Sequence, residues 1–109
     1  MLFDVPSRLA GLLLTYADVF GMPDEAGTLV RYPLTQRMLA DGLGVVERSV
    51  RRALTEWKKE GLITTKKGWF VIAGMEALDR LSGELRFSIN YRPQIDGARL
   101  KQRTQDPER

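Results

Sequence analysis

The sequence contains neither cysteine nor histidine among its 109 residues. The absence of cysteine excludes disulfides and thiolate metal sites and is typical of a reducing compartment, so we expect a cytoplasmic protein. The absence of histidine removes both the commonest general base and the commonest metal ligand. Because no paired carboxylates or lysines form a catalytic constellation either, we expect no enzyme activity, no cofactor and no metal.

Long apolar runs are also missing. The longest uninterrupted aliphatic run is Leu12 to Leu14, far too short to cross a bilayer, and the first residues carry no basic segment typical of a signal peptide. We therefore expect no membrane partner. Hydrophobic residues make up 43% of the chain and charged residues 28%, a balance typical of one globular domain.

Charge is distributed unevenly along the chain. Residues 1–45 carry a net charge of −2, residues 46–67 carry +4, and residues 68–109 carry +1. A local cationic excess in 22 residues is expected for a protein that binds a polyanion, although a solvated helix face gives the same pattern.

Helical periodicity and start and stop signals predict helices over about residues 5–20, 35–42, 46–60 and 74–82. Thr35 is expected to cap the second helix, and Gly44 to supply the positive φ of a sharp turn before the third. Residues 21–28 are predicted to form a loop and Leu29 to Tyr32 a short strand.

A β-hairpin is predicted over residues 62–72, with Gly68 in its turn. Helix, tight turn, helix and then hairpin predict a winged helix-turn-helix, a mainly α fold with a small β wing (α+β), over residues 1–84. Residues 85–109 are interpreted as a C-terminal extension, with a strand over 85–91 and a flexible tail.

The third predicted helix has two contrasting seams. An apolar seam recurs at helical spacing and is expected to be buried, Trp57 included, while a basic seam lies opposite it. The apolar residues are Val50, Ala53, Leu54 and Trp57, and the opposite ones are Arg48, Arg52, Thr55 and Lys59. In strand 69–72, Trp69 alternates with Val71, which predicts that their shared face also contributes to the core.

An exposed basic seam suits the major groove of DNA. There the planar guanidinium group of an arginine can donate two hydrogen bonds to guanine, and a glutamate can accept a hydrogen bond from the amino group of cytosine. The predicted base-contacting residues are Glu47, Arg48, Ser49 and Arg52. The predicted phosphate-contacting residues are Thr35, Gln36, Arg37, Arg51, Thr55, Lys59, Lys66, Lys67 and Gly68. Double-stranded DNA is thus the expected partner.

Simpler interpretations of the same residues stay open at this point. Arg48 and Arg52 could pair with Glu47 or Glu56 on a wet surface, and the pair Lys66–Lys67 could be an ordinary hairpin tip. At the level of the whole chain, the alternative is a winged helix that binds another protein through the predicted strand 85–91 and does not bind DNA.

Residues from about Asp4 to Leu81 resemble the C-terminal domain of the Crp/Fnr family of bacterial transcription regulators. The residues that carry the resemblance are Val5 to Ala10, Leu34 to Gln36 with Leu39–Ala40, Leu43 to Val45, Ser49 to Leu54 and Glu60 to Ile63. The resemblance implies a sequence-specific regulator that binds an inverted-repeat operator as a homodimer, and it makes RNA polymerase a further candidate partner. In that family an effector-binding β-roll and a dimerisation helix precede this domain, so any effector is expected to bind outside this sequence.

The chain departs from the family at the start of the third helix. The family has a capping Ser or Thr where this chain has Val46, and Arg-Glu where it has Glu47-Arg48. Arg52 matches the family's later base-contacting arginine. The resemblance therefore implies insertion into the groove and a role for Arg52, with an operator sequence that differs from the family's usual one.

Overall fold

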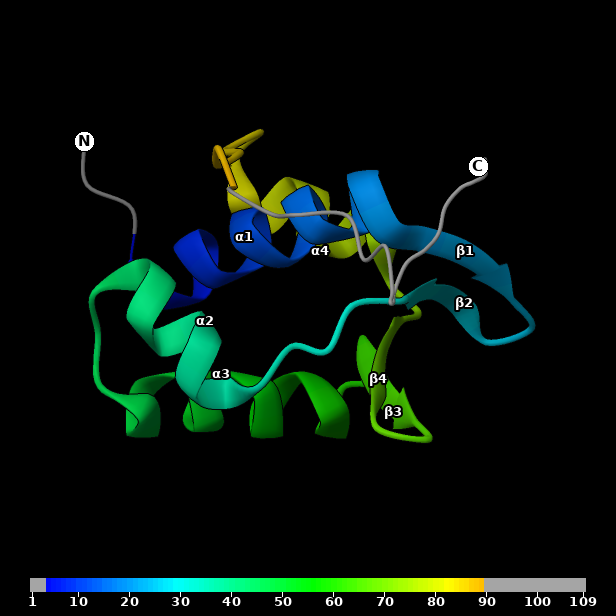
Figure 1. Cartoon of the computed structure of the whole chain (residues 1–109), viewed down its shortest axis with the longest axis horizontal. Helices are drawn as coiled ribbons and strands as arrows, with labels where there is room; N and C mark the ends of the chain where they lie inside the picture. The colour runs from blue at the N-terminus through cyan, green and yellow to red at the C-terminus, as the bar shows by residue number, and fades with distance from the viewer. Residues whose placement is uncertain (1–3, 90–109) are drawn as a thin grey trace, which may run out of the picture.

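The computed structural model describes residues 4–89. Along the chain these residues form four helices and four short strands (Figure 1). In chain order the elements are α1 (Val5–Phe20), β1 (Gly21–Asp24), β2 (Gly27–Val30), α2 (Gln36–Leu43), α3 (Glu47–Lys59), β3 (Ile63–Lys66), β4 (Trp69–Ile72) and α4 (Met75–Ser82). All four predicted helices are present, within a residue or two of their predicted ends.

The loop predicted for residues 21–28 is wrong. These residues form the antiparallel hairpin β1–β2, in which Gly21 pairs with Val30 and Asp24 with Gly27. The predicted strand at Leu29 therefore begins two residues earlier and ends at Val30. Pro23 is tolerated because β1 lies at the edge of the sheet, where an N–H group is not required for pairing.

The strands form one antiparallel sheet in the order β1-β2-β4-β3. Val30 pairs with Phe70, and Ile63 with Ile72, and all four side chains are buried in the main core. Successive side chains of a strand point to opposite faces, so the outer face of the sheet carries Leu29, Lys66 and Trp69. The hairpin β3–β4 is the wing.

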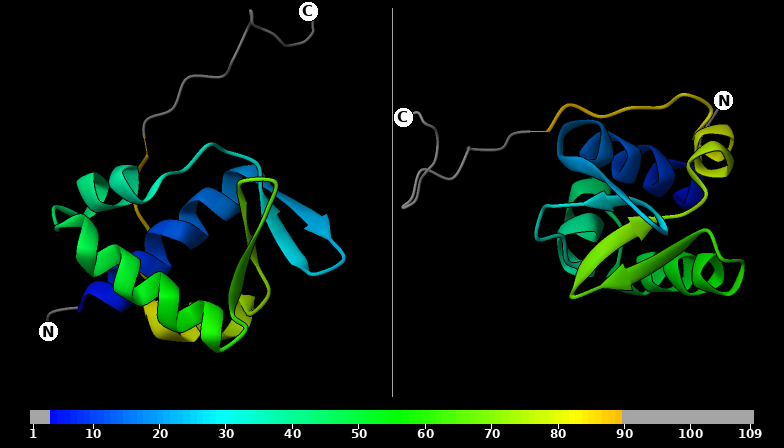
Figure 2. Two further views of the ribbon diagram at one scale, coloured as in Figure 1. Left: turned by 90° about the horizontal axis from the view of Figure 1, so that it is seen from below. Right: turned by 90° about the vertical axis from the view of Figure 1, so that its right-hand side faces the viewer.

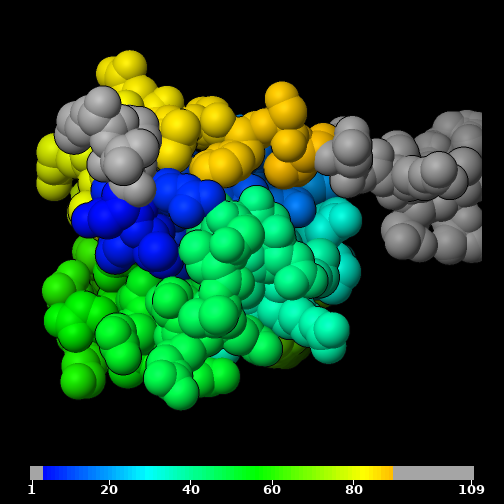
Figure 3. All heavy atoms as spheres, turned by 90° about the vertical axis from the view of Figure 1, so that its left-hand side faces the viewer, coloured from blue at the N-terminus to red at the C-terminus, as the bar shows by residue number. Residues whose placement is uncertain are grey.

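Helix α1 is the centre of the fold. It lies between α4 on one side and α2 with α3 on the other (Figure 3). Its apolar residues are buried almost all round, as expected of a helix that is covered on several faces. The buried residues of α1 include Leu9, Ala10, Leu12, Leu13, Leu14 and Ala17.

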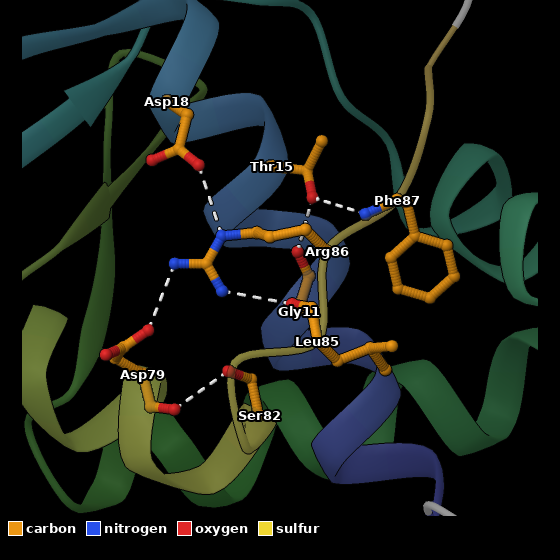
Figure 4. Close-up of polar contacts among 8 residues, drawn as sticks. All are labelled: Gly11, Thr15, Asp18, Asp79, Ser82, Leu85, Arg86 and Phe87. Atoms are coloured by element: carbon orange, nitrogen blue, oxygen red, sulfur yellow. Dashed lines mark hydrogen bonds and ion pairs between the residues drawn. The ribbon is translucent and has the colours of Figure 1, made fainter.

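The predicted strand over residues 85–91 is wrong for its described part. Residues 85–89, here called the C-terminal strap, cross α1 without pairing to any strand (Figure 4). The backbone N–H of Phe87 donates to Thr15 Oγ1 at 2.9 Å, and Thr15 in turn donates to the Gly11 carbonyl at 2.8 Å. The strap does not form a strand because a helix, and not a sheet edge, meets its backbone. The rest of that prediction, residues 90 and 91, lies outside the described residues.

Arg86 fixes the strap to two helices. Its guanidinium group lies 3.1 Å from a carboxylate oxygen of Asp18 on α1 and 3.0 Å from one of Asp79 on α4 (Figure 4). Although partial burial opposes the charged form, the hydrogen bonds that Arg86 donates to these two carboxylates raise the pKa of Arg86. The strap is thus a fixed part of the surface above α1.

Candidate nucleic-acid interface

The tight turn between α2 and α3 has the geometry predicted from the sequence. Thr35 caps α2, because its side chain accepts a hydrogen bond of 3.0 Å from the N–H of Met38. Gly44 ends α2 with φ +70°, in the left-handed region that glycine adopts without strain. Both predictions are confirmed: Thr35 fixes the start of α2, and Gly44 forms the turn that leads to α3.

Helix α3 buries the predicted seam. Val50, Ala53, Leu54 and Trp57 are all buried, and only 4% of Trp57 is exposed. The interpretation of Trp57 as a core residue is therefore confirmed. Because one face of α3 is fixed against the core, the opposite face must point to solvent. The residues on that face, Arg48, Arg52, Thr55 and Lys59, are all exposed.

The predicted base-contacting residues gather at the N-terminal half of α3. Glu47, Arg48 and Arg52 are exposed, and Ser49 is half-buried. Within residues 4–89 every ion pair lies elsewhere, so neither arginine is neutralised by Glu47 or Glu56. The guanidinium groups of Arg48 and Arg52 are thus available to an external acceptor.

The first turn of α3 lacks a capping side chain, as the sequence predicts. Val46 has the extended backbone of an N-cap residue, but its side chain accepts no hydrogen bond and is 67% exposed. Glu47 supplies an acidic side chain in the first turn, where a helix dipole favours negative charge. Thus α3 begins with a favourable charge but without a side-chain cap.

The predicted phosphate-contacting residues fall into three groups, at the start of α2, on α3 and in the turn of the wing (Figure 2). Those on α3, Arg51, Thr55 and Lys59, are all exposed. At the start of α2, Thr35 and Arg37 are exposed and Gln36 is half-buried. Across from them lies the turn of the wing, where Lys67 has φ +53° and Gly68 has φ +86°. Positive φ at both central residues is the geometry that a two-residue hairpin turn favours, which confirms the predicted place of Gly68 in the turn. The predicted contact of Gly68 with a phosphate stays a prediction.

Lys66 differs from its neighbour in the wing. Its ammonium nitrogen lies 2.9 Å from a carboxylate oxygen of Asp24 on β1. The hydrogen bond between them raises the pKa of Lys66 and lowers the pKa of Asp24. Lys66 therefore already has an acceptor, whereas Lys67 has no ion pair within residues 4–89. No local signal in the sequence indicates this pairing, because it depends on the hairpin β1–β2.

The prediction that Trp69 and Val71 share a buried face is confirmed for Val71, which has no exposed surface, but not for Trp69, which is only half-buried. Both lie on the outer face of the sheet, and neither belongs to the main core cluster. The guanidinium carbon of Arg31 lies 5.5 Å from the centroid of the Trp69 ring. Arg31 is not among the predicted site residues, because the sequence indicates only its place within the predicted strand Leu29 to Tyr32.

Comparisons with known proteins agree with this geometry. The family model of the Crp-like helix-turn-helix domain matches residues 7–81. The chain is 32% identical over 77 residues to the CRP-like cAMP-activated global transcriptional regulator of Mycobacterium tuberculosis (strain H37Rv), which covers 71% of this chain and 34% of that protein. The chain thus spans about a third of the length of the curated relatives it matches.

Solved structures show the same fold. TTHB099, a CRP-family transcriptional regulator from Thermus thermophilus, matches with a TM-score of 0.69 and 27% identity, over 77% of this chain and 43% of that one. The CO-dependent transcription factor CooA from Carboxydothermus hydrogenoformans matches with a TM-score of 0.67 and 24% identity, over 72% of this chain and 37% of that one. The predicted winged helix-turn-helix is confirmed. None of the helices within residues 4–89 has the length and apolar character needed to cross a membrane.

Proposed function

Because the chain belongs to the Crp-like helix-turn-helix domain family, we propose that it binds double-stranded DNA sequence-specifically, as the DNA-binding part of a cytoplasmic transcription regulator. The observation that carries this proposal is the orientation of α3. Its apolar seam is buried, and Arg48 and Arg52 are exposed on the opposite side, where neither forms an ion pair with another residue of the described range 4–89.

In this proposal the exposed face of α3 enters the major groove. The planar guanidinium group of arginine can donate two hydrogen bonds to O6 and N7 of a guanine, and each such pair discriminates against a wrong base by about 1–3 kcal/mol. Glu47 can accept from the amino group of a cytosine beside it. Arg48 and Arg52 lie four residues apart, about one turn of α3, so they would address neighbouring base pairs.

Contacts with the DNA backbone would flank this helix. The free amide groups at the start of α2 and the charge of Arg37 suit one phosphate, because a helix N-terminus favours anions. Lys67 and Gly68 in the wing suit another, and Arg51, Thr55 and Lys59 border the exposed face of α3. Such contacts position the protein on the duplex but do not select a sequence.

The proposal extends to assembly. The relatives are longer transcription regulators, of which the matched segments cover 34% and 43%, and two copies of such a domain would bind an inverted repeat. RNA polymerase is a further proposed partner of the whole regulator. The alternative, a module that binds only proteins, loses its main support because the strap forms no strand over its described residues.

Selection from a random duplex library by the purified chain tests the proposal. We expect enrichment of a defined sequence, and a palindromic consensus would show binding by two copies. Arg52→Ala should cost about 1–3 kcal/mol on the selected site and much less on random DNA. Lys67→Ala should weaken both equally. Arg80→Ala, an exposed arginine on α4, is the matched control. A library with no enriched sequence would contradict the proposal.

A further inference from the structure

We propose a further contact with the DNA backbone, outside the helix-turn-helix, in the cleft between the hairpin β1–β2 and the wing. Here the guanidinium group of Arg31, held on the Trp69 ring, binds a phosphodiester group together with Lys67. This inference rests on the proposed DNA binding and adds to it a site that lies on the sheet and not on the helices.

The cleft has a volume of about 240 Å³ and is open to solvent. Its walls combine two cations that have no ion pair within residues 4–89, one ion pair and an aromatic ring. The lining residues are Asp24, Leu29, Arg31, Lys66, Lys67 and Trp69. Side chains of this kind favour an anion that also has apolar edges, as the sugar-phosphate backbone does.

The sheet register places Arg31 at this cleft. Trp69 pairs with Lys66 across the wing and lies on the same outer face as Leu29. Arg31 follows β2 directly, and its backbone N–H donates to the Phe20 carbonyl at 3.0 Å. Its main chain is therefore fixed beside the sheet, and its side chain extends along the outer face.

Stacking prepares Arg31 to bind an anion. The guanidinium carbon lies over the Trp69 ring, 5.5 Å from its centroid, and Nη1 donates to Met22 Sδ, a weak acceptor, at 4.0 Å. The other guanidinium N–H groups have no hydrogen-bond partner within residues 4–89. Those groups form a planar fork that matches a phosphate. Because the ring already restricts the side chain, less conformational entropy is lost when a phosphate binds.

The charges in the cleft leave Arg31 and Lys67 as the anion-binding pair. Asp24 is neutralised by Lys66 at 2.9 Å, so neither partner of that ion pair acts as an isolated charge. Glu25, in the turn of hairpin β1–β2, is the remaining nearby carboxylate, and its charge makes a minor contribution to the raised pKa of Lys66. Arg31 and Lys67 together outweigh that single carboxylate.

The position of the cleft fits a duplex bound by α3. The view from below in Figure 2 shows the turn of the wing beside the segment that leads from β2 to α2. That segment continues from Arg31 to Thr35, the cap of α2. Arg31 thus lies between the two predicted backbone contacts, one at Lys67 and one at the start of α2, and would join them into a continuous track.

The test measures how salt weakens DNA binding by the full 109-residue chain. Binding to the selected duplex and to a random duplex is titrated over a range of salt concentrations. Arg31→Ala should weaken binding to both duplexes roughly tenfold at low salt. It should also reduce the slope of log K against log salt by about 1. Arg31→Lys should retain most of that slope, and Arg80→Ala should change neither quantity.

Trp69→Leu tests whether the ring positions Arg31. It should weaken DNA binding by roughly twofold to fivefold in the unaltered chain and have no effect in the Arg31→Ala background. A purely structural role of Trp69 would weaken binding equally in both backgrounds.

The two failures are distinguishable. If the unaltered chain binds DNA but Arg31→Ala has the same affinity and salt slope, the proposed phosphate contact of Arg31 is overturned and the proposed function stands. If the unaltered chain binds neither duplex at low salt, both are overturned.

Discussion

The ammonium nitrogen of Lys66 lies 2.9 Å from a carboxylate oxygen of Asp24, and this ion pair links side chains from β3 and β1, the two edge strands of the sheet. The carboxylate also accepts from the N–H of Ala26 at 3.0 Å. Asp24 thus already binds Lys66, the side chain that the sequence alone predicts to contact a phosphate.

Removing the charge of Asp24 should strengthen DNA binding. In Asp24→Asn the ammonium group of Lys66 loses its carboxylate partner and can bind a phosphate. We expect higher affinity for selected and random duplexes alike, with the salt slope steeper by about 0.9. Fluorescence anisotropy titrations at several salt concentrations would measure both quantities.

Two variants control for the general loss of negative charge. Glu25→Gln removes an exposed carboxylate next to Asp24 that has no ion pair within the described residues. It should change affinity less than Asp24→Asn does. In a Lys66→Ala background, Asp24→Asn should have little effect. Equal gains from Asp24→Asn and Glu25→Gln would show that Lys66 is not the group released.

Acid should weaken the fold partly through two aspartates. The hydrogen bond from Lys66 lowers the pKa of Asp24 below its ordinary value of 3.8, and the N–H of Ser7 lowers the pKa of Asp4 in the same way. A carboxyl group whose pKa is depressed in the folded state adds stability above its unfolded pKa. That stability is lost as the pH falls through the folded value.

Urea unfolding between roughly pH 2 and 6 measures this effect. The free energy of unfolding should decrease as the pH is lowered from about 4. The fall should be shallower in Asp24→Asn and shallowest in the double variant with Asp4→Asn. At the alkaline end, the raised pKa of Lys66 has the opposite sign, so its contribution is present below pH 10.5 and lost as the pH rises further. If the free energy of unfolding depended on pH in the same way for the variants and the unaltered chain, Asp24 and Asp4 would not be the source of the acid sensitivity.

The helices and the two seams of α3 could be predicted from the sequence because helical periodicity is a local property. Thr35 and Gly44 carry equally local signals for a cap and a turn. The hairpin β1–β2 could not, since its four-residue strands contain Pro23 and become a sheet only by pairing with β4. Residues far apart in sequence, such as Asp24 and Lys66, meet only after that pairing. For the same reason Arg31 was not recognised as a candidate site residue.

A capping side chain at the start of α3 should stabilise the fold. Val46 already has extended backbone geometry, so Val46→Ser would place a hydroxyl oxygen where it can accept from a first-turn N–H. We expect the free energy of unfolding to rise by about 0.5–1 kcal/mol. Thr35→Ala, which removes the existing cap of α2, should lower it by about 1 kcal/mol.

Val46→Ala separates capping from the loss of an exposed apolar side chain. It should leave stability nearly unchanged, because alanine cannot cap. Chemical denaturation of the three variants alongside the unaltered chain gives the comparison. If Val46→Ser is no more stable than Val46→Ala, the first turn of α3 gains nothing from a side-chain acceptor.

The C-terminal strap makes a specific prediction about two helical glycines. A Cβ at Gly11 of α1 would lie 2.7 Å from the carbonyl oxygen of Leu85, a backbone atom that cannot move aside without shifting the strap. A Cβ at Gly42 of α2 would meet only a side-chain carbon of Leu12, at 3.4 Å. Alanine is the better helix former by about 1 kcal/mol, so the same substitution should have opposite effects at the two positions.

Gly42→Ala should therefore raise the free energy of unfolding by about 0.5–1 kcal/mol, while Gly11→Ala should lower it by about 1–3 kcal/mol. Urea denaturation of both variants measures the difference, and exchange of the Phe87 amide proton reports on the strap itself. The Phe87 N–H donates to Thr15 Oγ1 at an N···O distance of 2.9 Å, so its proton should exchange faster in Gly11→Ala but not in Gly42→Ala. If Gly11→Ala were as stabilising as Gly42→Ala, the strap could not lie against α1 in solution, since only its contact at Leu85 makes the two glycines different.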